Sequence, residues 1–166
     1  MLMFTDASHG NKPLMSGVGM ILIDKHKEYN AGAYTNKCKD NNIAEVAAVA
    51  FGLKYCSDNK IFDKSSDKTL TILTDSAYTV QRIRDNTPPR TNEEEEYLNY
   101  IHSFMKTSKF KINFLQIKGH VHDGTKFAYY NNIADQIAKE YRYLGIYNLE
   151  KDRIKQYKIS KMKRQR

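Results

Sequence analysis

Short apolar runs and one alternating segment mark the first part of the chain. The runs are Leu2–Thr5 and Gly17–Asp24, and the segment Tyr29–Thr35 alternates apolar and polar positions. A period of two residues is typical of a half-buried strand, and the stretch SHGNKPLMSG between the two runs has the Gly, Asn and Pro residues of a turn-forming loop. Three strands joined by short connections predict an antiparallel meander.

The spacing of apolar residues lengthens in the middle of the chain. Asn42–Ser57 is rich in Ala and apolar on almost every face, which predicts a buried helix. Later segments predict, in order, a strand, two helices, a strand and a helix, at Thr69–Thr74, Ser76–Arg84, Thr91–Lys106, Lys111–Ile117 and Asn132–Leu144. Thr91 and Glu94 form a capping-box pattern at one helix start. This order predicts an α/β fold, a mixed sheet covered by helices whose later strands run parallel through right-handed crossovers.

Four acidic residues lie among apolar neighbours. Asp6 and Asp75 end the first and fourth predicted strands, Glu45 is the only charge in Ile43–Leu53, and Asp135 lies early in the last predicted helix. A buried charge is costly unless it is paired or binds a cation. Each acid alone is explained equally well by a helix cap or a local ion pair. Together they occupy strand ends and first helical turns, where α/β folds place their sites, and so indicate one common site.

Converging carboxylates have a characteristic chemistry. They repel one another and raise each other's pKa unless hard divalent cations neutralise them. A ligand set made only of oxygen favours Mg²⁺ or Mn²⁺ over zinc. Two such ions about 3.5–4 Å apart stabilise the attacking and leaving oxygens of an in-line phosphodiester displacement. The acids by themselves therefore predict metal-assisted phosphodiester hydrolysis.

Five short motifs carry a family resemblance that spans Leu2 to about Leu144. In chain order they are Thr5-Asp6-Ala7-Ser8, Asn41-Asn42-Ile43-Ala44-Glu45, Thr74-Asp75-Ser76, Lys118-Gly119-His120 and Asn131-Asn132-Ile133-Ala134-Asp135. In this order they resemble the motifs of type 1 ribonuclease H. Each motif alone is weak, whereas five in sequence on the expected elements are specific.

The resemblance implies an RNase H-like fold, a five-stranded mixed sheet of three antiparallel and then two parallel strands flanked by helices. It also implies endonucleolytic cleavage of the RNA strand of RNA–DNA hybrids, leaving 5′-phosphate and 3′-hydroxyl ends. Asp6, Glu45, Asp75 and Asp135 match the family's metal-binding acids, which hold two Mg²⁺ or Mn²⁺ ions. Asp6 would bridge both ions and orient the attacking water.

A histidine and several asparagines extend the resemblance. His120 matches the mobile histidine that assists proton transfer or product release, and His122, two residues further on, is the alternative because the loop before Asp135 is long. Positions that match residues holding backbone or 2′-hydroxyl groups are Asn11, Asn41, Asn42 and Asn131. An amide donates and accepts without charge, which suits recognition of the 2′-hydroxyl group. Turn chemistry is the competing explanation for these asparagines.

The chain also departs from the family pattern. Ala77 replaces a Gln that often contacts RNA, and Asp40 stands where a hydroxyl residue often helps to hold a DNA phosphate. The basic, Trp-containing segment of several bacterial relatives is absent, since the chain has no Trp and its corresponding region reads Asn92–Glu96. We expect those glutamates to form a solvated first helical turn.

Charge is concentrated at the end of the chain. The net charge is +8, and residues 151–166 contain eight basic residues and one acidic residue. We expect a catalytic domain over residues 1–148 and a basic extension over residues 149–166. Three interpretations of residues 151–166 are open: contact with nucleic acid, disorder without effect, or contact with an acidic partner. No stretch approaches the ~18 apolar residues of a membrane span, and the N-terminus has no signal-peptide pattern. Cys38 and Cys56 are expected to be free thiols in a cytoplasmic protein.

Two other functions are open at this point. One is a non-catalytic nucleic-acid-binding protein with an RNase H fold, and the other is a related DNA nuclease or integrase. The intact acid set weighs against the first, because a binder gains nothing from four carboxylates that face phosphates. The asparagines and the Lys118-Gly119-His120 motif weigh against the second. The leading prediction is therefore a monomeric, metal-dependent ribonuclease H.

Overall fold

A five-stranded mixed sheet forms the centre of the protein in this computed structural model. The structure describes residues 1–85, 87–119 and 125–164, with residues 157–164 described by their backbone alone. The strands, in chain order, are β1 Leu2–Asn11, β2 Leu14–Asp24, β3 Lys27–Thr35, β4 Thr69–Thr74 and β5 Lys111–Gln116. Their order across the sheet is β3-β2-β1-β4-β5. β1, β2 and β3 pair antiparallel, whereas β4 and β5 run parallel to β1, which confirms the predicted fold class.

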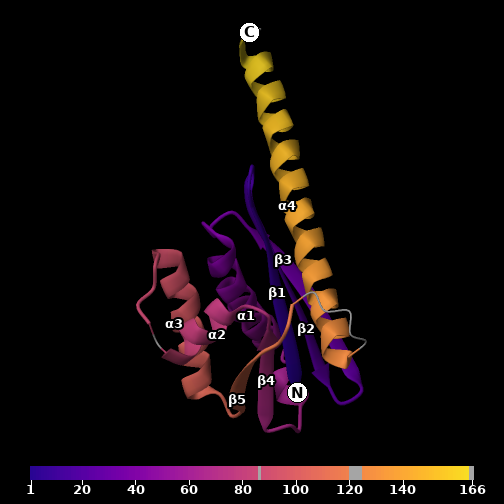
Figure 1. Ribbon diagram of the computed structural model, residues 1–166. Coiled ribbons are helices and arrows are strands. Elements are labelled where there is room, and N and C mark those ends of the chain that lie inside the picture. Colours follow the sequence, from indigo (N-terminus) through magenta and orange to yellow (C-terminus); the bar gives the residue numbers. More distant parts are fainter. Residues whose placement is uncertain (86, 120–124, 165–166) are drawn as a thin grey trace.

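Helices cover both faces of the sheet. They are α1 Asn41–Asp58, the 3₁₀ turn η1 Phe62–Lys64, α2 Ala77–Asp85, α3 Asn92–Thr107 and α4 Lys126–Arg164. Figure 1 shows α4 across one face and α1, α2 and α3 on the other. The larger apolar core lies between the sheet and α1, where Met3, Met20 and Leu22 are fully buried. A smaller core holds Phe4 and Ala134 under α4.

Small residues bring α4 close to the sheet. Gly17 and Gly19 of β2 lie directly under the backbone of α4, and a Cβ atom at either position would collide with a carbonyl oxygen, that of Ala138 or Ala134 respectively. Ala134 and Ala138 are fully buried themselves. This close approach fixes the helix along β1 and β2, and it places Asp135 near the edge of β1.

The first strand is longer than the sequence pattern indicated. β1 and β2 pair continuously from Leu2–Ile23 to Asn11–Leu14, so most of the stretch predicted to be a loop is strand. β4 pairs with β1 only at Leu2–Phe4, and the rest of β1 therefore has one open edge. Polar residues are tolerated at this edge. The end of the strand therefore shows no apolar alternation, and the sequence pattern did not predict it. The prediction that Asp6 ends the first strand was thus wrong, because Asp6 lies in its middle.

The last helix is also longer than predicted. α4 has 39 residues, begins at Lys126 rather than Asn132, and continues past Leu144 to Arg164. Asp135 is therefore in its third turn rather than its first. Gly145 lies within the helix and is buried, and a Cβ there would collide with Met15 and Tyr34.

The basic end of the chain continues α4 without interruption. Figure 1 shows this part of the helix projecting beyond the sheet, and residues 151–156 are exposed. The division into a domain over residues 1–148 and an extension over residues 149–166 stays a prediction. No helix in the described part of the chain combines the length and the apolar character that a membrane crossing requires. Cys38 and Cys56 are buried free thiols, as predicted.

Candidate active site

Three of the four predicted acids converge at the open edge of β1. One carboxylate oxygen from each of Asp6, Glu45 and Asp75 lies within 4.8 Å of the other two. Asp6 comes from the middle of β1, Glu45 from the second turn of α1, and Asp75 directly follows β4. The sheet produces this meeting, because β4 pairs with β1 just before the two strands reach their acids. The backbone at Gly119 packs against the Asp75 carboxyl group, where a Cβ atom would not fit.

Two carboxylates of this cluster, those of Asp6 and Glu45, are buried and incompletely paired, whereas Asp75 is half-buried. Asp6 and Glu45 are 4% and 5% exposed. The Ala7 backbone N–H donates to Asp6 Oδ1 at 2.7 Å, and Asn41 Nδ2 donates to Glu45 Oε1 at 3.4 Å. Asp6 Oδ2 and Glu45 Oε2 are buried without a hydrogen-bond partner among the described residues. Each acid thus has one oxygen held by the protein and one oxygen left for another ligand.

Burial and mutual repulsion raise the pKa values of Asp6 and Glu45 and so make these two groups hard to ionise. Burial raises the pKa of Asp6 to about 7, and the negative charge of Asp75 adds to the shift. Burial also raises the pKa of Glu45 well above its ordinary value, with the charges of Asp6 and Asp75 as further causes. A divalent cation would reverse both effects, because hard oxygen donors converge on one point. The residues present therefore fit a divalent metal ion.

Asp135 lies beside the cluster but is held differently. Its Oδ2 accepts a hydrogen bond from Lys139 Nζ at 2.6 Å, one turn further along α4. The side chain of Asp135 is 17% exposed, so it is more accessible than Asp6 or Glu45. Its charge still contributes to the raised pKa of Asp6, which shows that the two carboxylates are near one another. Asp135 therefore stands at the margin of the cluster, with Lys139 as a counterion.

The predicted substrate residues surround the cluster at different distances. Asn41 and Asn42 begin α1, and Asn131 lies one turn before Asp135 on α4, buried and with its Oδ1 unpartnered in the described structure. Asn11 is the last residue of β1, and its Oδ1 is 2.8 Å from His9 Nε2. The two candidates for the mobile histidine, at positions 120 and 122, lie outside the described residues.

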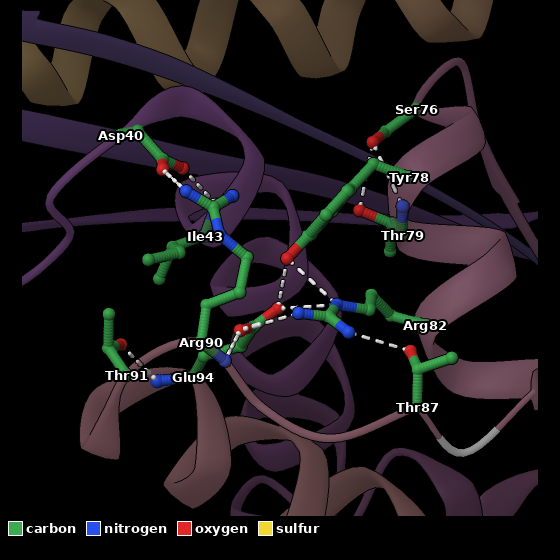
Figure 2. A network of polar contacts seen from close by, with 10 residues as sticks. All are labelled: Asp40, Ile43, Ser76, Tyr78, Thr79, Arg82, Thr87, Arg90, Thr91 and Glu94. Atoms are coloured by element: carbon green, nitrogen blue, oxygen red, sulfur yellow. Dashed lines mark hydrogen bonds and ion pairs between the residues drawn. The ribbon is translucent and has the colours of Figure 1, made fainter.

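A buried ion pair between α2 and α3 was missed by the sequence analysis. Glu94, expected on a solvated helical turn, is fully buried. Arg82 donates to its carboxylate from Nε at 3.1 Å and from Nη2 at 3.3 Å, and the Tyr78 hydroxyl and the Arg90 backbone N–H also donate to it (Figure 2). Thr91 caps α3 by accepting from the Glu94 backbone N–H at 3.1 Å, as the capping-box pattern predicted. The four donors around the carboxylate explain why a glutamate is tolerated in the core.

This network connects the elements that carry two of the acids. α2, which follows Asp75, contributes Tyr78 and Arg82. Arg90 reaches from the start of α3 to Asp40, with its Nη2 2.7 Å from Asp40 Oδ2 (Figure 2). Asp40 in turn caps α1 by accepting from the Ile43 backbone N–H at 3.0 Å. The carboxylate at position 40, which stands where a hydroxyl residue often helps to hold a DNA phosphate, is thus paired with an arginine.

Comparison with known proteins identifies the family. The RNase H family model matches residues 1–142, most of the chain. This chain belongs to the RNase H family. RNase H family proteins are ribonucleases that generally depend on divalent metal ions, and the carboxylate cluster described above is a donor set of the kind such ions require. No curated protein sequence matches the chain significantly.

Solved structures of RNase H proteins share the fold. LC11-RNase H1, isolated from compost by a metagenomic approach, was solved in complex with an RNA/DNA hybrid; its TM-score is 0.68 at 20% identity, covering 87% of this chain and 98% of that chain. The N-terminal RNase H domain of Rv2228c from Mycobacterium tuberculosis gives a TM-score of 0.66 at 14% identity, covering 89% and 96%. RNase H1 from Halobacterium salinarum gives 0.63 at 15% identity, covering 84% and 95%. At these identities the likeness shows the fold.

Proposed function

We propose that this RNase H protein hydrolyses the RNA strand of RNA–DNA hybrids with the help of two Mg²⁺ or Mn²⁺ ions. The observation that carries the proposal is the pair of buried, unpartnered oxygens, Asp6 Oδ2 and Glu45 Oε2, beside Asp75. A buried carboxylate oxygen without a donor is costly unless a cation compensates it. The hybrid in the complex of LC11-RNase H1, a protein of the same fold, supports the choice of substrate.

The acids of the chain would hold the ions and position the reacting groups. Asp6, Glu45 and Asp75 would be the inner ligands. Asp135 would complete the set once Lys139 Nζ no longer donates to its Oδ2. The Ala7 N–H and the Asn41 side chain each fix one oxygen of their carboxylate, so that the other oxygen keeps its direction. Bound divalent ions would supply electrostatic stabilisation of the attacking and leaving oxygens. His120, or His122 as the alternative, would assist proton transfer or product release.

The asparagines around the cluster would provide the preference for RNA. Asn41 and Asn42 lie at the N-terminus of α1, and Asn131 lies one turn before Asp135. Their amide groups can both donate to and accept from a 2′-hydroxyl group, which DNA lacks. Asn11 lies further along β1 and would contact the backbone of a strand that follows that edge. Ala77 offers no polar contact at its position.

Cleavage of three matched duplexes tests the proposal. The protein is incubated with a labelled RNA–DNA hybrid, a DNA duplex and an RNA duplex of the same sequence, in Mg²⁺, in Mn²⁺ and in EDTA. We expect the RNA strand of the hybrid to be cut in either metal and in no sample with EDTA, while both homoduplexes stay intact. A hybrid that stays intact in both metals would refute the proposal and favour the non-catalytic binder. Preferential cutting of the DNA duplex would favour the related DNA nuclease.

Thermal unfolding should reveal the metal site independently of activity. The folded-state pKa of Asp6, about 7, lies above its ordinary value of 3.8, so the folded state resists ionisation. As pH rises from about 4 to about 7 the unfolded chain ionises first, and the metal-free protein loses stability across this interval. At pH 8 in EDTA we therefore expect Asp6→Asn to raise Tm by about 3 °C or more, roughly 1 kcal/mol for a chain of this size. At pH 4 we expect little change.

Added Mg²⁺ should raise the Tm of the wild type more than that of Asp6→Asn. At pH 8 it should raise the Tm of the wild type, because an ion that binds only the folded state stabilises it, and should affect Asp6→Asn much less. Asp63→Asn, which changes an exposed carboxyl group on η1, is the matched control and should behave like the wild type. An equal Mg²⁺ response in Asp6→Asn and the wild type would rule out Asp6 as a ligand.

The basic end of α4 should contribute to binding of the hybrid. Residues 151–166 contain eight basic residues and one acidic residue, while the body of the chain lacks the basic segment of its bacterial relatives. Deleting these residues should weaken hybrid binding and flatten its dependence on salt, because fewer counterions are released. Binding curves across a salt series measure both quantities. If affinity and salt slope are unchanged by the deletion, the segment only affects solubility.

A further inference from the structure

The open edge of β1 continues well beyond the carboxylate cluster. After Phe4 this strand pairs only with β2, because its pairing with β4 covers Leu2–Phe4 alone. Side chains two residues apart on a strand share a face, so Asp6, Ser8 and Gly10 line one face of β1 in succession. The cluster lies at the beginning of this open stretch, and the hairpin between β1 and β2 lies at its end.

The helix α4 lies over β2 and beside β1 on one face of the sheet. Asp135, Lys139 and Arg142 are spaced by four and three residues, which places them on one side of the helix. Asp135 lies near Asp6, as their electrostatic coupling shows. The guanidinium group of Arg142 lies against Gly10, where a Cβ atom would collide with it. Strand and helix therefore run side by side from the carboxylates to Arg142, and seven residues of helix correspond to about 10 Å.

Arg142 is a cation without a counterion in the part of the chain that the structure describes. Neither a hydrogen bond nor an ion pair joins it to another described residue, and its Nε is buried with no partner. The two arginines of the network around Glu94 provide a contrast, since Arg82 pairs with Glu94 and Arg90 with Asp40. A partly buried guanidinium is costly when unpaired and is well suited to bind an anion through two parallel hydrogen bonds.

We infer that Arg142 binds a backbone phosphate of the hybrid, on the strand that also carries the cleaved bond. The inference rests on the proposed function, and it adds a contact on α4 about 10 Å from Asp135. Gly10 leaves room for the guanidinium in its observed position, where a Cβ atom would force the Arg142 side chain to shift. Arg153, exposed and eleven residues further along α4, lies on the same side of the helix and leads toward the basic end.

Binding measurements with three variants test this contact. Arg142→Gln should lower the affinity for a hybrid about five- to tenfold in EDTA, and the slope of log affinity against log salt should fall by about one. Arg142→Lys keeps the charge and should retain most of the slope. Lys111→Gln removes an exposed charge at the start of β5 and should change neither quantity. The Tm of each variant shows whether it is folded.

A scan of the substrate locates the contact. Each phosphate of one hybrid is replaced in turn by a neutral methylphosphonate, and affinity is measured for the wild type and for Arg142→Gln. One phosphate near the cleaved bond should matter for the wild type and not for Arg142→Gln. Identical profiles for the two proteins, or an unchanged affinity and slope in Arg142→Gln, would overturn the inference. A wild type that cuts the hybrid while these results fail leaves the proposed function intact, whereas a wild type that never cuts it refutes the proposed function.

Discussion

Replacing Asp75 by Asn should lower the rate of hybrid cleavage by about three orders of magnitude or more while leaving hybrid binding intact. The amide has nearly the shape of the carboxyl group, so the fold around Gly119 is preserved. It lacks the negative charge that a divalent ion requires, and loss of such a charge removes electrostatic stabilisation at the reacting phosphate. Binding should stay equal or become slightly tighter, because one negative charge near the phosphates is gone.

Single-turnover cleavage in Mg²⁺ and equilibrium binding in EDTA measure the two effects separately. Asp85→Asn is the matched control, since Asp85 is an exposed carboxyl group at the end of α2. It should cleave and bind like the wild type. A wild-type cleavage rate in Asp75→Asn would show that the cluster is not the catalytic centre, and a joint loss of cleavage and binding would show that Asp75 acts on the fold instead.

Replacing Glu94 by Ala should reduce the free energy of unfolding by about 3–5 kcal/mol. The change removes a fully buried carboxylate and leaves Arg82, the Tyr78 hydroxyl and the Arg90 backbone N–H without their acceptor. An unpaired buried guanidinium is the largest part of that cost. The network joins α2, which follows Asp75, to the start of α3 and, through Arg90 and Asp40, to the N-terminus of α1, the helix that carries Glu45 (Figure 2).

Urea unfolding followed by circular dichroism measures the loss. Glu95→Ala, which changes the exposed neighbour on the same turn of α3, is the control and should shift stability by less than about 0.5 kcal/mol. Glu94→Gln should fall between the two, because the amide oxygen still accepts from some of the donors. A loss in Glu94→Ala no greater than that in Glu95→Ala would mean that the network contributes nothing to stability.

The sequence predicted the element types and one common site for four acids, of which Asp6, Glu45 and Asp75 meet in the structure. Asp6 and Asp75 lie together because β1 and β4 run parallel and both acids come just beyond the residues that pair these strands. Glu45 followed from the apolar character of α1, in which a single charge stands out. These features depend on local pattern and simple topology, and both are visible in one sequence.

Other features depend on partners that are distant in the sequence. The length of β1 is set by continuous pairing with β2, not by its own polar residues. Glu94 is buried because Arg82, twelve residues earlier, packs beside it. The pairing of Asp135 with Lys139 is local and could have been noticed, since the two are one helical turn apart. That Asp135 lies at the margin of the cluster could not be predicted without the position of α4.

The chemical ends of the cleaved RNA test the central claim most directly. A hybrid whose RNA strand carries a label is cut in Mg²⁺, and the new termini are identified by mass spectrometry. Attack by water that the carboxylate-bound ions activate predicts 5′-phosphate and 3′-hydroxyl termini within the RNA strand, and no cleavage once EDTA is added. Products that end in a 2′,3′-cyclic phosphate, or cleavage that persists in EDTA, would contradict the account, because the attacking group would then be the 2′-hydroxyl of the RNA rather than water at the metal site.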